Sequence, residues 1–301
     1  MRRVLTRQDY GEVFKMTGRA VPRVVEPAEE LVDLAAYGFR VACETCLQCR
    51  DYHAVWGYER LARVKGNGFE SERDILGILF RDYTPQRGRI MIAGAADAGL
   101  LALIAQEARY REPRITVVDR CVTPLSICRR FAASHDLKIA TAQQDLASGP
   151  FTPSHTLALA HNVLLHMPVP QWSEFLRNTR LSLDRGGVLV LVQRVKASTP
   201  SANLRPPPAE YAERTLTELS ARNIALPEAE ARFRRRLEDY SESKSSWSDP
   251  SIGADYLESL LIGAGFAIAR RIDHDRRRTA PSRDGGEATS MATHIFVAIN
   301  A

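Results

Sequence analysis

Two segments of the sequence carry the residue types of a nucleoside-binding site. In the first, the apolar run from Ile90 to Ala93 stops at Gly94, and small residues lead to Gly99 and a helical pattern. Glycine tolerates a sharp backbone bend and lets a ligand approach closely. Asp97 lies just before the expected helix, where a carboxylate caps amides or meets a cationic ligand group. The segment predicts a strand, a tight turn and a helix start.

The second segment supplies a matching carboxylate. The apolar run 115–118 ends in Asp119, which lies twenty residues after Gly99. An acidic side chain at the end of a second strand is placed to accept hydrogen bonds from both hydroxyls of a ribose. An ordinary strand-end role is the alternative, and the neighbouring glycine turn favours the ribose role.

Two histidines are candidate general bases, because imidazole titrates near neutral pH. His166 follows the fourth expected strand, where a loop would face the substrate. A positional role in the turn is the competing interpretation. His53 and its neighbour Tyr52 lie on an N-terminal helix that we expect to point toward the substrate cavity or the cofactor. They complete the predicted catalytic set of His53, His166 and Tyr52.

Three cysteines close to His53 invite a metal interpretation. They are Cys43, Cys46 and Cys49, and the last two share one face of a helix with His53. A single rigid helix cannot wrap four tetrahedral ligands around one zinc ion, and no second C-x-x-C follows. We therefore predict no metal site.

The elements that must position these residues follow from the spacing of apolar residues. Residues 1–85 read as helices, with one continuous helical pattern from Val41 to Arg63. From Arg89 onward, strands and helices alternate, which predicts a parallel sheet with helices on both faces. We expect strands near 89–94, 114–119, 137–142, 156–161 and 187–193, and helices near 98–110, 123–135 and 170–183.

The segments after the fifth strand add helices and two further strands. Residues 208–242 read as two helices broken at Pro227, an insertion between sheet elements. An amphipathic segment at 256–262 precedes a strand at 267–272, and a last strand covers 293–299. In a parallel sheet with right-handed crossovers, ligands bind at the carboxyl ends of the strands. Those ends hold Gly94, Asp119, Asp145 and His161.

Composition and charge narrow the function classes. A chain of 301 residues with 45% hydrophobic and 26% charged residues can form one large α/β domain with additions. No apolar run reaches membrane-spanning length, and the first residues lack the apolar middle of a secretory leader. Five cysteines without extracellular context indicate reduced thiols in a cytoplasm. Of these, Cys121 and Cys128 look like small core residues.

The net charge of +5 includes two basic clusters, at 232–236 and 276–278. One continues a helical segment of mixed charge and the other lies in a polar loop, which favours solvated surface over a nucleic-acid interface. We expect a small-molecule substrate, no nucleic-acid partner and no membrane partner; a homodimer is one option for the oligomeric state.

Two families share the glycine turn and the acidic strand end. Gly94, Ala96 and Gly99 fit a loosened G-x-G-x-x-G/A dinucleotide fingerprint, with Asp119 as its ribose acid. The same residues resemble motif I and the second-strand acid of class I S-adenosylmethionine (SAM)-dependent methyltransferases.

The segment from 156 to 192 favours the second family. A strand ends at His161, His166-Met-Pro follows, and Leu-Asp-Arg-Gly-Gly precedes the fifth strand. This succession closely resembles the small-molecule class I methyltransferases, with Arg185 where the usual form has proline. The closing Ala-Gly-Phe266 and two last strands also resemble that family's sheet edge, and the resemblance spans roughly 75–301.

The resemblance implies a fold and a set of cofactor contacts. The fold is α/β, a Rossmann-like seven-stranded, mostly parallel sheet with an antiparallel closing strand and helices on both faces. A helical cap would cover 1–85, and the core would cover 86–301, with a helical insertion at about 200–250. Gly94, Ala95, Ala96 and Gly99 would pass under the methionine and ribose of SAM. Asp97, or a water that it holds, would face the amino or sulfonium group.

The remaining implied contacts lie at the ends of the second and third strands. Asp119 would accept the ribose hydroxyls, and Arg120 would flank the adenine. In the segment that starts at Gln144, Asp145 would bind the adenine amino group and the Leu146 amide a ring nitrogen.

The last implied contact is His161. Its side chain or its carbonyl oxygen would touch the methionine amino group; a structural role for this histidine is the alternative.

Methyl transfer needs mainly alignment and desolvation of a nucleophile. Only a protonated acceptor needs a base, and His53 or His166 would serve. The predicted function is methyl transfer from SAM to a natural product or metabolite. The alternatives are an enzyme that cyclises or cleaves SAM itself, a nicotinamide- or flavin-dependent oxidoreductase, and a non-catalytic protein of the same fold.

Overall fold

The apolar runs that follow Arg89 form a seven-stranded sheet in the computed structural model of the protein, which describes residues 28–47, 49–62, 68–196, 206–243, 253–276 and 291–301. The strand order is β3-β2-β1-β4-β5-β7-β6. β2 pairs in parallel with β1 and β3, β4 pairs in parallel with β5, and β7 runs antiparallel to β5 and β6. The predicted fold class is confirmed. The strands are β1 Arg89–Ala93, β2 Arg114–Asp119, β3 Ile139–Gln143, β4 His155–His161, β5 Leu183–Lys196, β6 Phe266–Arg276 and β7 Met291–Asn300.

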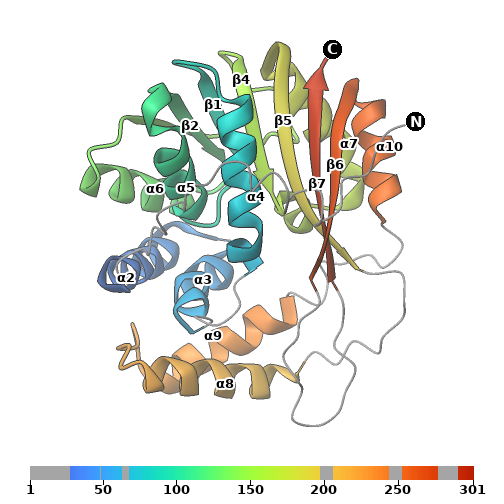
Figure 1. The fold of residues 1–301 in the computed structure, drawn as a ribbon. Helices are drawn as coiled ribbons and strands as arrows, with labels where there is room; N and C mark the ends of the chain where they lie inside the picture. Colours follow the sequence, from blue (N-terminus) through green and yellow to red (C-terminus); the bar gives the residue numbers. More distant parts are fainter. Residues whose placement is uncertain (1–27, 48, 63–67, 197–205, 244–252, 277–290) are drawn as a thin grey trace. The chain divides into compact units, whose positions relative to one another are not determined.

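Helices connect and flank these strands (Figure 1). They are α2 Ala28–Thr45, α3 Arg50–Ala62, α4 Gly68–Tyr83, α5 Gly99–Ala108, α6 Val122–Ser134, α7 Trp172–Leu181, α8 Pro208–Ala221, α9 Glu230–Ser243 and α10 Ala254–Gly263. Short 3₁₀ turns are η1 Arg109–Arg111, η2 Val163–His166 and η3 Val169–Gln171. Within the described residues, no helix is both long enough and apolar enough to cross a membrane.

The chain divides into two compact units. The described parts of 24–145 and 206–246 form the first unit, which contains α2 to α6, β1 to β3, α8 and α9. The described parts of 146–205 and 247–301 belong to the second unit, which contains β4 to β7, α7 and α10.

The first unit is built on β1 and β2. Residues Ile90 to Ala93 are completely buried, as is typical of a parallel strand that is covered on both faces. In the paired register, Ile90 stands beside Ile115 and Ala93 beside Val118. α6 packs against α2, and α8 and α9 pack against each other and against α3 (Figure 1).

The predicted continuous helix from Val41 to Arg63 is wrong. α2 ends at Thr45 and α3 begins at Arg50, so the chain bends between them and the two helices pack against each other. Their contact is close, because a Cβ atom on Gly57 would lie 2.7 Å from the Cβ atom of Ala35. Packing of the two apolar faces outweighs the local preference for one uninterrupted helix.

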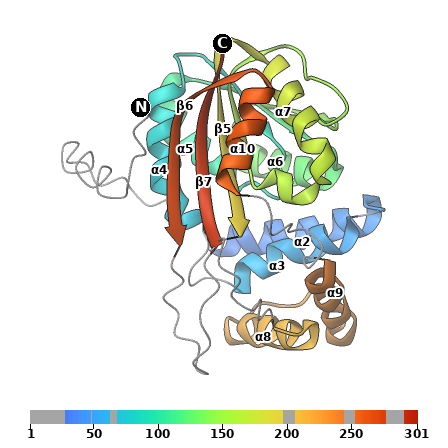
Figure 2. The ribbon, with the colours of Figure 1, turned by 90° about the vertical axis from the view of Figure 1, so that its right-hand side faces the viewer.

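The second unit is built on the antiparallel pairing of β5 with β7. These strands pair from Val188–Ile299 to Lys196–Met291, with buried apolar side chains along both. Figure 2 shows β5, β7 and β6 in that order, with α10, which packs on β6 and α7. β5 starts at Leu183, earlier than predicted, because Leu183 already pairs with His155.

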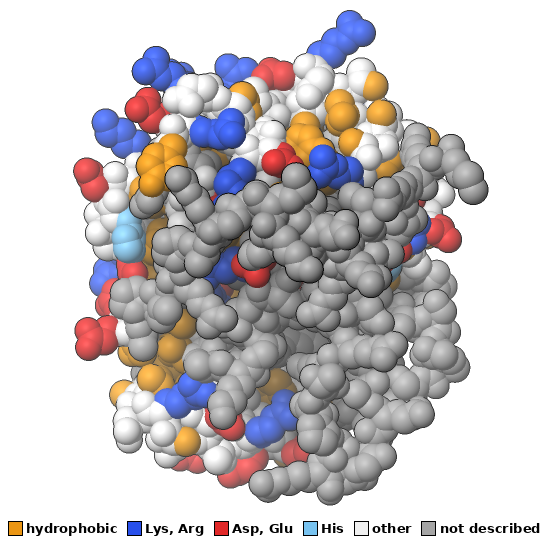
Figure 3. Space-filling view, in the orientation of Figure 1, with side chains coloured by type: hydrophobic (Ala, Val, Ile, Leu, Met, Phe, Trp, Pro, Cys, Tyr) orange, Lys and Arg blue, Asp and Glu red, His pale blue; other side chains and the backbone are white. Residues whose placement is uncertain are grey.

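Much of the basic cluster at 232–236 is engaged in ion pairs. Arg234 contacts Glu213 and Glu230, and Arg236 contacts Asp51 and Glu228. On the face shown in Figure 3, the basic side chains of the described residues are interspersed with acidic ones. The cluster therefore joins α9 to its neighbours within the first unit.

Candidate functional site

The turn after β1 has the form that the sequence predicts. β1 ends at Ala93, Gly94 adopts a φ of 84°, and α5 begins at Gly99. Glycine is favoured at such a positive φ, since other residues meet a steric penalty there. The Gly94 amide donates a hydrogen bond of 2.8 Å to the carbonyl oxygen of Val118, which fixes the turn beside the end of β2.

Asp119 holds this turn and the start of α6 together. One carboxylate oxygen accepts a hydrogen bond of 2.9 Å from the Ala95 amide, and the other accepts one of 2.7 Å from the Cys121 amide. Burial raises the pKa of the Asp119 carboxyl above its ordinary value, against the opposing effect of these two amides. A carboxylate has about four acceptor positions. Asp119 can therefore accept further hydrogen bonds from a ligand.

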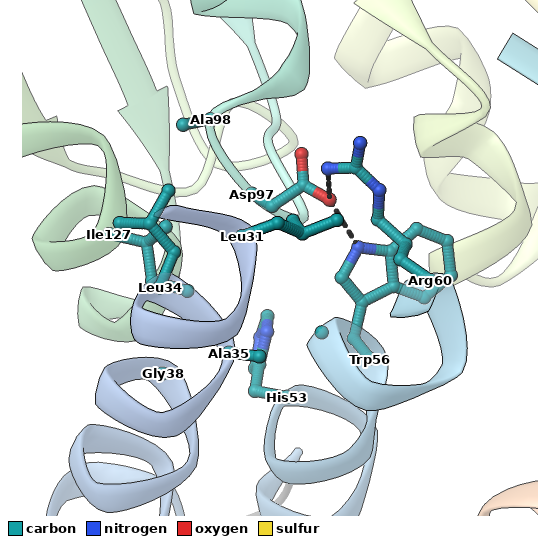
Figure 4. Close-up of a pocket in the computed structure, with 11 residues that line it drawn as sticks. Leu31, Leu34, Ala35, Gly38, His53, Trp56, Arg60, Asp97, Ala98 and Ile127 are labelled. Carbon is teal, nitrogen blue, oxygen red and sulfur yellow. Dashed lines mark hydrogen bonds and ion pairs between the residues drawn. The ribbon is translucent and has the colours of Figure 1, made fainter. Parts of the chain in front are cut away.

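Asp97 is fixed by α3 and by the start of α5. The Gly99 amide donates to one carboxylate oxygen at 2.7 Å, and the Trp56 indole donates to the other at 2.6 Å. Arg60 forms an ion pair of 2.8 Å with that second oxygen. Figure 4 shows Trp56 and Arg60 reaching it together. A cationic ligand group at Asp97 would therefore share the carboxylate with Arg60.

The pKa of Asp97 reflects these contacts. Burial opposes ionisation of the carboxyl, but the charge of Arg60 and the hydrogen bonds from Gly99 and Trp56 outweigh it, so that the pKa is lowered. Trp56 and Arg60 did not enter the predicted site. Their i, i+4 spacing signals that they share one helix face. The sequence does not reveal that Asp97, 41 residues after Trp56, meets that face.

A small pocket lies beside this carboxylate (Figure 4). Its cavity volume of about 20 Å³ gives room for roughly one or two water molecules. His53 lines it, but a nucleoside does not fit inside it, so the predicted orientation of His53 toward a substrate cavity or the cofactor stays a prediction. The lining residues are Leu31, Leu34, Ala35, Gly38, His53, Trp56, Gly57, Arg60, Asp97, Ala98 and Ile127.

Tyr52 packs into an aromatic group. Its ring centroid lies 5.5 Å from that of Trp56 and 5.8 Å from that of Tyr240. Burial raises the pKa of the Tyr52 hydroxyl well above its ordinary value, and nearby Asp97 adds to the shift. The hydroxyl therefore stays protonated at physiological pH.

The predicted adenine contacts of the first unit lie next to Asp119. The Gln144 amide donates a hydrogen bond of 2.9 Å to the carbonyl oxygen of Asp119, and the carbonyl oxygen of Arg120 accepts one of 3.2 Å from the Gln143 side chain. Asp145, partly buried, follows directly. The structure thus brings Arg120, Gln144 and Asp145 to the same strand ends as the glycine turn.

The other predicted residues belong to the second unit. Leu146 is buried, and its carbonyl oxygen accepts a hydrogen bond of 2.8 Å from Asn178. His161 ends β4, with its Nδ1 atom 3.3 Å from the side-chain nitrogen of Asn162. His166 ends η2 and is half-buried.

Asn162 fixes the backbone after β4. It adopts a left-handed φ of 55°, its amide donates to the carbonyl oxygen of Val192 at 2.7 Å, and its side-chain oxygen accepts from the Arg194 amide at 2.8 Å. Asparagine tolerates this conformation better than most residues. Sequence reasoning did not single out Asn162, although its place at a strand end beside His161 was a signal.

The sequence interpretation of Cys121 as a core residue is incomplete. Cys121 is buried, but its sulfur lies 3.3 Å from that of Cys46 and 3.6 Å from that of Cys49. The hydrogen bond from the Cys49 thiol is the main cause that lowers the pKa of Cys121 to about 3; burial opposes it, and His53 and the Thr123 amide contribute in the same direction.

No protein-family model matches the chain, and the curated proteins contain no match to it. Among solved structures, a protein from Bordetella parapertussis described as a "possible exported protein" is 13% identical, with 94% of this chain and 98% of that one covered, at a TM-score of 0.50. The N-methyltransferase NodS from Bradyrhizobium japonicum, in complex with S-adenosylhomocysteine, is 15% identical over 81% and 97% of the chains, at a TM-score of 0.48. The [4+2]-cyclase SpnF is 18% identical over 75% and 80%, also at 0.48.

At such identities a likeness concerns the fold alone. The strand order and the antiparallel β7 of this protein are those of the class I SAM-dependent methyltransferase fold.

Proposed function

We propose that the protein is a methyltransferase that binds SAM and transfers its methyl group to a small-molecule acceptor. The observation that carries the proposal is the Asp119 carboxylate, which two backbone amides hold beside the Gly94 turn. Two ribose hydroxyls can donate to its remaining acceptor positions. The glycine turn itself lets the methionine part of the cofactor lie close to the backbone.

The neighbouring strand ends would complete the cofactor site. Asp145 would accept a hydrogen bond from the adenine amino group, and Arg120 would flank the ring. The proximity of Gln144 to Asp119 supports this assignment, because adenine and ribose are adjacent in one nucleoside. The Leu146 amide and His161 stay as proposed contacts to the adenine and to the methionine amino group.

Methyl transfer from a sulfonium ion needs mainly alignment of the nucleophile with the methyl group. A base is needed only if the acceptor carries a proton. Of the two predicted bases we retain His166, because the ring of His53 lies among three cysteine sulfurs. Tyr52, with its raised pKa, is better suited to packing than to proton removal.

Calorimetry with SAM and S-adenosylhomocysteine tests the cofactor assignment. Asp119→Asn keeps the size of the side chain but loses its charge and one acceptor oxygen. Hydrogen bonds to a charged group contribute about 1.5–3 kcal/mol each, so we expect Kd to rise at least about tenfold. Asp136→Asn is the matched control, because Asp136 is exposed and has a left-handed φ of 51°, which asparagine tolerates. No heat of binding with the unmodified protein would refute the proposal.

The products distinguish methyl transfer from its alternatives. Incubation with SAM and candidate acceptors should give S-adenosylhomocysteine, whereas an enzyme that cleaves or cyclises SAM would release methylthioadenosine from SAM alone. Thermal stabilisation by NAD but not by SAM would instead identify a nicotinamide enzyme.

We also propose a cytoplasmic location, on the basis of thiol chemistry. The five cysteines, at positions 43, 46, 49, 121 and 128, are all free. Free thiols in this number are typical of a reducing compartment.

A further inference from the structure

Four potential metal ligands meet in the first unit, next to the Asp119 loop. They are Cys46, Cys49, His53 and Cys121, and one ligand atom from each lies within 4.8 Å of all the others. The Cys121 sulfur is 3.3 Å from that of Cys46 and 3.6 Å from that of Cys49. Three sulfurs and one imidazole nitrogen at this spacing form a compact four-membered ligand set.

The bend between α2 and α3 makes this arrangement possible. Cys46 follows the last residue of α2, and Cys49 precedes the first residue of α3. His53 lies in the first turn of α3, and Cys121 arrives from a distant part of the chain, as the residue before α6. The sequence argument against a metal assumed one rigid helix and overlooked Cys121 as the fourth ligand. The bend between the helices removes that assumption, and Cys121 lies beside the other residues of the set.

Three of the four potential ligands are buried. Cys46, His53 and Cys121 are at most 8% exposed. Among the described residues, the Nδ1 atom of His53 is buried and has no hydrogen-bond partner. A buried polar atom without a partner destabilises a fold by about 1–3 kcal/mol. An ion bound at this cluster would account for placing an imidazole among sulfurs.

Polar groups from the start of α6 surround two of the sulfurs. Cys121 directly precedes α6, whose first amides carry partial positive charge. The hydroxyl of Thr123, in the first turn of α6, lies 2.9 Å from the Cys46 sulfur. Such contacts around ligands are common in metal sites, where they orient the first ligands.

The chemistry of the donors selects the ion. Thiolates and imidazole in a tetrahedral S₃N set are typical of Zn²⁺. With Zn–S bonds of about 2.3 Å, the sulfurs of a tetrahedral site lie about 3.8 Å apart. The observed separations of 3.3 and 3.6 Å are about 0.5 and 0.2 Å shorter than that value, so a small outward movement of the sulfurs would accommodate the ion. A disulfide could engage only two of the three sulfurs and would not use the imidazole of His53.

We propose that Cys46, Cys49, His53 and Cys121 bind one Zn²⁺ ion in a closed, structural site. Four protein ligands leave no open position for a substrate or a catalytic water. The ion would join the end of α2 and the start of α3 to the residue whose amide donates to Asp119 at 2.7 Å. It would therefore fix the loop that carries Asp119, and binding would release protons from the thiols.

Metal analysis of the purified full-length chain tests the proposal. After reconstitution with Zn²⁺ and removal of excess metal, elemental mass spectrometry should find about one zinc ion per chain. Cys49→Ser and Cys121→Ser should each lose most of it. Cys43→Ser is the matched control, because Cys43 lies on α2 one turn before Cys46 and outside the ligand set. It should keep a full equivalent.

A spectroscopic measurement on the unmodified protein covers the case in which a variant fails to fold. Reconstitution with Co²⁺ should give thiolate-to-metal charge-transfer absorption and the strong visible bands of tetrahedral cobalt. Stoichiometric addition of Zn²⁺ should then abolish these bands. Both readouts are taken without SAM, so they are independent of the proposed methyl transfer.

Three results would overturn the proposal. One is a reconstituted chain with no more zinc than Cys121→Ser. Another is equal loss of zinc from Cys43→Ser and Cys121→Ser. The third is a Cys46–Cys121 disulfide in the freshly purified protein, detected by peptide mass spectrometry, together with octahedral cobalt spectra.

Discussion

Arg60 on α3 and Asp97 before α5 form an ion pair of 2.8 Å in which each side chain is 19% exposed. The same carboxylate accepts hydrogen bonds from the Trp56 indole and the Gly99 amide. Within the first unit, one acidic side chain thus connects α3 to the turn that begins α5. Removal of its charge should affect both elements.

We expect Asp97→Asn to destabilise the protein by about 1.5–3 kcal/mol near neutral pH, because hydrogen bonds to a charged group are lost. The pKa of Asp97 is lowered in the folded state. Its contribution is therefore fully present above the ordinary value of 3.8 and is lost as the pH falls through the lower folded pKa. Urea unfolding across this range should show the difference from the unmodified protein shrinking at acid pH.

The control for Asp97→Asn is an exposed pair. Arg177 and Glu174 contact each other with 55% and 52% exposure, so that Glu174→Gln should change stability by less than about 0.5 kcal/mol. A difference for Asp97→Asn that did not vary with pH would contradict the assigned pKa direction.

Gly57→Ala should separate α2 from α3. An added Cβ atom would lie 2.7 Å from the Cβ atom of Ala35 and 2.8 Å from its Cα atom, so the helix backbones must move apart. Overpacking of this kind destabilises proteins by about 1–3 kcal/mol. Gly263→Ala, also in a helix but with open space around the added atom, should be neutral or stabilising. Equal changes in the thermal unfolding of the two variants would show that α2 and α3 have room for an added methyl group at Gly57.

Glu59 connects α3 to α8 and α9. The carboxylate is 1% exposed and accepts hydrogen bonds from the hydroxyls of Tyr211 at 2.6 Å and Tyr240 at 3.0 Å. Tyr211→Phe and Tyr240→Phe should each lower the free energy of unfolding by about 1.5–3 kcal/mol, because each removes a donor from a buried charged group. Tyr256→Phe, at a 42% exposed position, should have little effect in the same denaturant titration. If all three substitutions had the same small effect, Glu59 would not join these helices.

Asn162 combines a left-handed backbone with a side-chain hydrogen bond. Asn162→Ala and Asn162→Gly both lose the side-chain bonds to the Arg194 amide and to His161, but only alanine is forced into an unfavourable φ of 55°. The free energy of unfolding of the alanine variant should therefore be lower than that of the glycine variant by about 1 kcal/mol in thermal unfolding. The same two substitutions at exposed Asn223, with a φ of 56°, isolate the backbone effect. A more stable alanine variant at position 162 would disprove this explanation.

Much of the sheet was predictable because local patterns determine it. Apolar runs bounded by polar or turn-forming residues gave β1, β2 and β4 to within about one residue at each end. β3 begins at Ile139 rather than at the predicted 137, since the Leu137 amide donates to the carbonyl oxygen of Ala132 and so belongs to the end of α6. The two helices on either side of Pro227 also formed as predicted.

The contacts between distant segments could not be derived from local patterns. Apolar spacing continues through residues 46–49, so only the packing of Gly57 on Ala35 and of Cys46 near Cys121 reveals the bend. For the same reason, the glycine turn and Asp119 were predicted, whereas the partners of Asp97 were not.

The contacts of Glu59 set an order of events during synthesis. Its tyrosine partners follow it by 152 and 181 residues. At translation speeds of about 5–20 residues per second, roughly ten to thirty seconds separate the carboxylate from those hydroxyls on the ribosome. The earliest described helices are therefore among the last parts of the molecule to complete their packing, so a nascent chain stalled before α8 would leave this acid without either hydroxyl.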